Sequence, residues 1–212
     1  MQKLAAYIST FPVKKFEKNQ LIVCQGDAPT TVYAIKSGFV KGYDINDQGM
    51  EQLLWFGSRM DIFPLGYMFG QIEESQFFYS AFSDVEAYAM KPDDLIQYLS
   101  NNPTPLMELT RRLTSTFYDS LHRLNAAERP KASDKIAHTL YFIANRFKKN
   151  SPPGVAEISL PLTHQDIANL LGLTRETAAV ELKKLKDAKL IYYDKWHFTV
   201  FTDKMKDHLS ID

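Results

Sequence analysis

The chain has 212 residues, 45% of them hydrophobic, so it is long and apolar enough to bury one large core or two smaller ones. Its 25 basic and 25 acidic residues cancel, and this balance points to no nucleic acid, membrane or acidic partner. The single cysteine, Cys24, excludes an internal disulfide and a cysteine-ligated metal cluster. Because neither a signal peptide nor a membrane-spanning stretch stands out, we expect a cytoplasmic protein without membrane contact.

Residues 16–90 have the residue pattern of an all-β domain. Seven of the nine glycines fall between Gly26 and Gly70, and they alternate with short apolar runs. Turn residues at this spacing are typical of an antiparallel sandwich or small barrel. Val85, Ala87 and Ala89 recur at period two and fit the last strands.

Helices are predicted after Pro92, first a short one and then a long one over 104–129. Apolar residues recur in the long helix at steps of three and four: Leu106, Leu109, Leu113, Phe117, Leu121 and Leu124. Such a stripe either packs on the chain's own core or pairs with a second copy of the helix. The pattern alone leaves both interpretations open.

Pro130 ends the long helix and opens a different segment. We expect a helix from Ser133 to about Phe147, a short strand at 158–160, helices over 163–171 and 174–188, and a pair of strands around Asp194–Trp196. Residues 1–130 hold 12 basic and 15 acidic side chains, and 131–212 hold 13 and 10, so net charges of −3 and +3 add to zero. The C-terminal part is therefore mildly basic.

The two helices over 163–171 and 174–188 have the spacing of a helix-turn-helix. Thr163 and Thr174 can each cap the helix that follows, and Gly172 supplies the left-handed residue that ends the first one. A short turn with glycine lets two helices cross at a wide angle and presents the N-terminus of the second one.

Arg175 and Glu176 occupy that N-terminus. An arginine can donate two hydrogen bonds to guanine and a glutamate can accept one from cytosine, so the pair can read base edges in the major groove. Other side chains around the turn can contact phosphates or add charge nearby. The predicted DNA-binding set is Thr163, His164, Gln165, Thr174, Arg175, Glu176, Thr177 and Lys183. An ordinary solvated helix start is the alternative, but the caps, the turn and the following strand pair together favour DNA.

These motifs resemble the cyclic AMP receptor protein and FNR superfamily of transcription regulators, over nearly the whole chain. The similar strings are PheGluLysAsnGlnLeuIle (16–22), GlnGlyAspAlaPro (25–29), the segment 32–43, AspIlePhe (61–63) and the turn from ThrHisGlnAspIleAla to ThrArgGluThr (163–177). The resemblance implies an α+β protein with a cyclic-nucleotide-binding-like β-roll in 1–103, a dimerisation helix in 104–130 and a winged helix-turn-helix in 131–212. It also implies a homodimer on palindromic promoter DNA in contact with RNA polymerase.

The sequence departs from the resemblance where the family's nucleotide sensors hold the cyclic phosphate. Pro64 and Leu65 stand where GlyGlu is expected, and Ser75 and Gln76 stand where an arginine and its hydroxyl neighbour are expected. Residues 62–81 contain no lysine or arginine, so we expect neither cyclic AMP nor cyclic GMP as the ligand. One cysteine excludes an iron–sulfur sensor of the FNR kind, and we expect no cofactor. On the second helix, Val180 replaces a basic residue that the family often carries, so the DNA half-site differs as well.

Aromatic residues occupy the phosphate-binding region instead, and they have two interpretations. They either line a pocket for an apolar or aromatic effector, or fill the interior of the roll, which then binds nothing; we favour the filled interior. The candidate pocket residues are Trp55, Phe63, Leu65, Tyr67, Phe69 and Phe77. A sensor in which DNA binding is secondary is thus the alternative to a DNA-binding regulator. An enzyme is not expected, because no catalytic motif is found and the five histidines are scattered.

Overall fold

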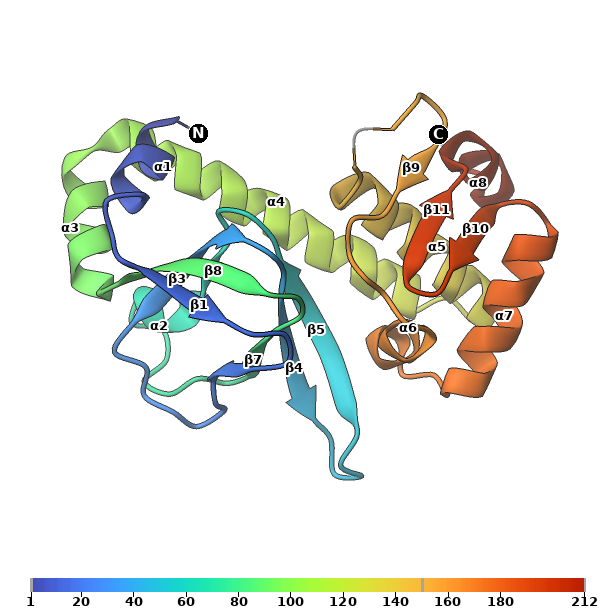
Figure 1. The fold of residues 1–212 in the computed structure, drawn as a ribbon, viewed down its shortest axis with the longest axis horizontal. Helices are drawn as coiled ribbons and strands as arrows, with labels where there is room; N and C mark the ends of the chain where they lie inside the picture. Colours follow the sequence, from blue (N-terminus) through green and yellow to red (C-terminus); the bar gives the residue numbers. More distant parts are fainter. Residues whose placement is uncertain (1, 150, 212) are drawn as a thin grey trace. The chain divides into compact units, whose positions relative to one another are not determined.

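A computed structural model describes residues 2–149 and 151–211, which form two compact units, Met1–Ser115 and Thr116–Asp212. The division falls inside one long helix, α4 (Pro103–Ala127) (Figure 1). Sequence analysis sets residues 104–130 apart as a segment, whereas the two halves of α4 belong to different units. Each unit is described by itself.

The first unit is built mainly of short antiparallel strands, as the glycine-rich texture predicts. Its elements before α4 are α1 (Gln2–Ile8), β1 (Val13–Phe16), β2 (Leu21–Val23), β3 (Val32–Ser37), β4 (Val40–Ile45), β5 (Glu51–Gly57), β6 (Ile62–Phe63), α2 (Leu65–Met68), β7 (Phe78–Ala81), β8 (Val85–Met90) and α3 (Pro92–Asn101). Among the described residues the strands form two four-stranded sheets, in the orders β1-β8-β3-β6 and β2-β7-β4-β5. The sequence analysis missed α1 and α2.

Strand β3 shows how the two cores of this unit are separated. Tyr33 and Ile35 point between the sheets, where they join buried residues from β2, β4, β7 and β8. Val32 and Ala34 point to the other face, where α1, α2, α3 and α4 supply the buried partners. The period of two along a strand therefore places one core inside the roll and a second core beneath the helices.

The second unit contains the predicted helix-turn-helix and strand pair. Its elements after α4 are α5 (Ala132–Arg146), β9 (Ala156–Glu157), α6 (His164–Leu171), α7 (Arg175–Asp187), β10 (Ile191–Asp194), β11 (His197–Val200) and α8 (Thr202–Leu209). The strands pair antiparallel in the order β10-β11-β9. The strand predicted at 158–160 is wrong by two residues: its apolar residues Ile158 and Leu160 are buried, but the ladder with β11 is made by Ala156 and Glu157.

Helix α4 has a buried side and an exposed apolar side. Leu109, which the sequence pattern placed in the apolar stripe, is buried in the core beneath the helices of the first unit. Leu113 is partly buried against the same core, whereas four members of the stripe are exposed, namely Leu106, Phe117, Leu121 and Leu124. The predicted single stripe is thus divided between two residues that pack on the core and four that do not. Within the described residues, none of the helices combines the length and hydrophobicity that a membrane span needs.

Candidate nucleic-acid interface

A capping box starts α6. The Thr163 backbone N–H and hydroxyl donate to Asp166 Oδ2 at 2.7 and 2.6 Å, and the Asp166 N–H donates to Thr163 Oγ1 at 3.1 Å. These reciprocal bonds satisfy donors that the helix start would otherwise leave open. The Thr163 hydroxyl is therefore engaged in hydrogen bonds inside the protein.

The turn between α6 and α7 has the predicted backbone geometry. Gly172 ends α6 in the left-handed region at a φ of +62°, which costs glycine little because it has no Cβ. Thr174 then caps α7 by accepting a 3.1 Å hydrogen bond from the Thr177 N–H. Arg175 and Glu176 occupy the first turn of α7, and both are exposed. The guanidinium and the carboxylate are consequently presented to solvent at a rigid, capped helix start.

His164, another residue of the predicted DNA-binding set, is half-buried at the start of α6. Its ring makes edge contacts with Tyr193 and Phe198, with ring centroids 5.1 and 6.4 Å apart. Burial lowers the pKa of His164, and the guanidinium of Arg175 lowers it further. The imidazole packs against Tyr193 and Phe198 of the β10–β11 hairpin and so joins the hairpin to the start of α6.

A cluster at the end of α7 joins it to the same hairpin, and the sequence analysis did not find it. The Lys186 ammonium lies 4.9 and 4.5 Å from the ring centroids of Tyr192 and Tyr193, and it donates to the Tyr193 carbonyl at 3.1 Å. Cation–π contacts of this kind stabilise a local arrangement by about 0.5–1 kcal/mol at exposed sites. These contacts depend on how the hairpin packs against α7. Helical or strand periodicity could therefore not have predicted the cluster.

The remaining predicted DNA contacts are distributed over the same surface. Gln165 is exposed and donates to Asn169 Oδ1 at 2.7 Å, and Thr177 is half-buried beside Thr174. Lys183 and Val180 are exposed on α7. The first turn of α7 and one of its sides are thus open, while α6 and the hairpin hold the helix from behind. A helix presented in this way fits the width of a DNA major groove.

The comparisons with known proteins agree with this geometry. Residues 134–203 match the Crp-like helix-turn-helix domain, and residues 13–102 match the cyclic nucleotide-binding domain. The anaerobic regulatory protein of Haemophilus influenzae is 30% identical over 199 residues, which cover 88% of this chain and 72% of that protein. The chain belongs to the CRP/FNR family of transcription regulators. It is a DNA-binding transcriptional regulator.

Another relative agrees with this assignment, and a solved structure shares the fold. Electron transport regulator A of Shewanella oneidensis is 26% identical over 179 residues, covering 84% of this regulator and 70% of that protein. The structure of FixK2 from Bradyrhizobium japonicum aligns with a TM-score of 0.77 at 18% identity, over 93% of this chain and 96% of that one. At that identity the structural likeness shows the shared fold.

The six candidate effector residues of the regulator do not gather around one cavity. Trp55 and Phe63 lie inside the roll, where the Phe63 ring stacks on Tyr33 and Tyr79 with centroids 5.6 and 5.3 Å apart. Leu65 and Tyr67 instead pack against the core beneath the helices, and Phe69 and Phe77 are exposed. The aromatic side chains that were expected near the phosphate-binding region are thus divided among the interior, the second core and the surface.

The positions expected to hold a cyclic phosphate lack a cation. Ser75, at the expected arginine position, is buried and donates to the Phe77 carbonyl at 2.7 Å. The preceding residues, Glu73 and Glu74, are carboxylates that repel a phosphate. The residues present do not fit a cyclic nucleotide.

Burial raises the pKa of Tyr79 to about 12, well above the ordinary value of 10.0. The folded state keeps this phenol neutral. The contribution of Tyr79 to the free energy of unfolding is therefore fully present below pH 10 and is lost as the pH rises from 10 toward 12. We expect the wild type to lose roughly 2–3 kcal/mol more of its unfolding free energy than Tyr79→Phe over that interval. Urea unfolding at pH 9, 10, 11 and 12 measures the difference; parallel curves for the two proteins would contradict it.

Proposed function

We propose that the regulator acts in the cytoplasm as a homodimer that places one α7 helix in each half of a palindromic promoter site and contacts RNA polymerase. The exposed Arg175 and Glu176 on the capped first turn of α7 carry this proposal. The exposed apolar face of α4 supports the dimer, because a contiguous apolar surface of this kind is typical of a protein interface. Two-fold symmetry of the protein implies a palindromic site.

Replacing Arg175 by alanine tests whether this residue reads a base. We expect Arg175→Ala to lose about 1–3 kcal/mol of discrimination at one G·C pair, because a bidentate arginine–guanine contact is removed. Lys183→Ala is the matched control: it deletes one positive charge from the exposed side of the same helix and should weaken all sequences alike. Fluorescence anisotropy with the operator and with single-pair variants measures both effects. Equal losses on specific and scrambled duplexes for Arg175→Ala would exclude base reading.

The operator itself can be obtained by selecting bound duplexes from a random DNA pool, with and without cell extract. We expect an enriched palindrome whose half-sites lie about one helical turn apart. Enrichment only with extract would indicate a required effector. Recovery of no palindrome under either condition would overturn the proposed mode of binding.

We propose further that the sensor unit uses neither a cyclic nucleotide nor an iron–sulfur cluster. The stretch 62–81 has no lysine or arginine, and Phe63, Tyr79 and Trp55 lie together inside the roll. The lone Cys24 cannot ligate a cluster. The relatives named above are regulators, which supports a chain with no catalytic role of its own.

A further inference from the structure

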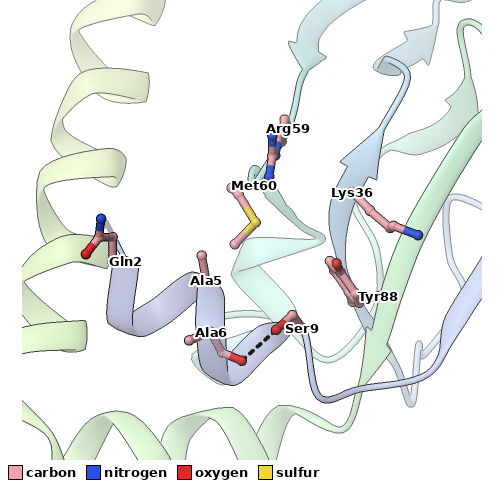
Figure 2. Close-up of a pocket in the computed structure, with 8 residues that line it drawn as sticks. All are labelled: Gln2, Ala5, Ala6, Ser9, Lys36, Arg59, Met60 and Tyr88. Carbon is pink, nitrogen blue, oxygen red and sulfur yellow. Dashed lines mark hydrogen bonds between the residues drawn. The ribbon is translucent and has the colours of Figure 1, made fainter.

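The first unit contains a cavity of about 420 Å³ outside the interior of the roll. Ala5 and Ala6 of α1 and Ser9, just after this helix, line one side, and Lys36, Met60 and Tyr88 lie across from them (Figure 2). Arg59, in the turn after β5, completes the lining. A cavity of this size lies within the range of small-molecule sites.

The lining combines an apolar wall with positive charge. Alanine side chains, the Met60 thioether and the Tyr88 ring supply the apolar surface, and no lining residue is acidic. Lys36 is engaged with Glu86, at 2.8 Å between Nζ and Oε2. Among the ion pairs in the described part of the chain, none involves the exposed Arg59 guanidinium. A guanidinium binds a carboxylate through two parallel hydrogen bonds, so the charge and the wall together suit a carboxylate with an apolar body.

Both walls of the cavity are bonded to α4. From the α1 side, the Leu4 N–H donates to Glu108 Oε2 at 3.0 Å. On the other side, Arg112 donates to Asp61 Oδ1 at 3.0 Å and to the Arg59 carbonyl. Glu108 and Arg112 are four residues apart and so lie on successive turns of one helix face. A ligand that draws α1 and the 59–60 turn together therefore acts on the two groups of hydrogen bonds that hold α4 in the first unit.

We propose that this cavity is an effector site for a small carboxylate with an apolar or aromatic body, and that its occupation changes DNA affinity through α4. The binding step depends only on the first unit. The effect on DNA rests on the proposed function, since a ligand shifts an equilibrium only by its different affinity for the two states.

Binding is tested on the full chain with 4-phenylbutyrate by isothermal titration calorimetry, with 4-phenylbutanol and 4-phenylbutylamine as neutral and cationic probes of the same shape. We expect the carboxylate to bind in the low-millimolar range or tighter, as is typical of a ligand of about a dozen heavy atoms. We also expect it to bind about tenfold more tightly than the alcohol or the amine. Absence of binding, or equal binding of the three probes, would overturn the proposal.

Two variants and a control assign the binding to this cavity. Arg59→Gln should reduce carboxylate affinity about tenfold, to the level of the alcohol, and Ala6→Phe should abolish binding by filling the space. Ala6 is exposed on α1, so circular dichroism is expected to show the wild-type fold. Lys3→Gln removes one positive charge from α1 outside the cavity lining and should leave the affinity unchanged within twofold. Wild-type affinity in Arg59→Gln or Ala6→Phe would refute the assigned site.

The coupling is tested by measuring operator affinity with and without saturating 4-phenylbutyrate. We expect a change of at least about fivefold in the wild type and none in Arg59→Gln. Carboxylate binding without a change in DNA affinity would overturn the proposed coupling but not the proposed binding site. A protein that binds the carboxylate but no DNA at all would contradict the proposed function instead.

Discussion

The double variant Phe117→Glu/Leu124→Glu is expected to be monomeric and to bind its operator about 10²–10⁴-fold more weakly than the wild type. This range is what the loss of a second, linked binding module costs, and it corresponds to roughly 3–5.5 kcal/mol. Phe117 and Leu124 are 61% and 58% exposed in the single chain. Charged residues there should therefore leave the fold of each chain intact while opposing pairing of two α4 helices.

Phe117 and Leu124 belong to a row of apolar residues along α4. Leu106, Leu113, Phe117 and Leu124 follow one another at steps of seven, four and seven, which keeps them on one side of the helix. The net charge of +3 on residues 131–212 provides few phosphate contacts for one copy. We therefore expect operator affinity to depend on two copies acting together.

Sedimentation velocity gives the mass, and anisotropy on the selected operator gives the affinity. Ser115→Glu is the control, because it adds a carboxylate to an exposed polar position on another side of α4. We expect this control to remain dimeric with wild-type affinity. If the double variant kept both the dimer mass and the operator affinity, α4 would not be the dimer interface.

Local sequence signals predicted the caps and the turn of the helix-turn-helix well, because each depends on neighbouring residues. Thr163, Gly172 and Thr174 act within three or four residues of themselves, and the structure confirms all three roles. The ring contacts of His164 were not predicted, because they involve Tyr193 and Phe198, about thirty residues along the chain. Contacts that depend on the packing of distant elements produce no helical or strand periodicity in the sequence from which they could be predicted.

The sensor unit shows the same limit. Glycine spacing predicted the strands, but it could not show that α1 and the turn at Arg59 enclose a cavity. The aromatic stretch drew attention to the interior of the roll, where Phe63 and Tyr79 stack on each other instead. Leu109 and Leu106 are equally apolar, and only the packing of α1 and α3 decides that Leu109 is the buried one.

Arg112→Met is expected to lower the free energy of unfolding by about 3–5 kcal/mol, the usual cost of leaving one partner of a buried ion pair alone. Asp61 is only 5% exposed, and its carboxylate accepts from Arg112 Nε at 3.0 Å. The Ser58 N–H also donates to it, at 2.7 Å, which fixes the turn. Methionine keeps much of the arginine's length but none of its charge, so the Asp61 carboxylate loses its cation.

Urea unfolding of Arg112→Met, Asp61→Asn and the double variant separates this pairing from general damage to α4. We expect the double variant to be more stable than the sum of the single losses predicts, by about 1–3 kcal/mol, because no unpaired charge is buried in it. Arg111→Met is the matched control: it removes a guanidinium from the adjacent, exposed position of the same helix and should change stability by less than about 0.5 kcal/mol. Strictly additive losses would mean that Arg112 supports the fold without pairing with Asp61. Because Arg112 also donates to the Arg59 carbonyl, the coupled result would show that this ion pair helps to hold the turn at Arg59, which lines the cavity, against α4.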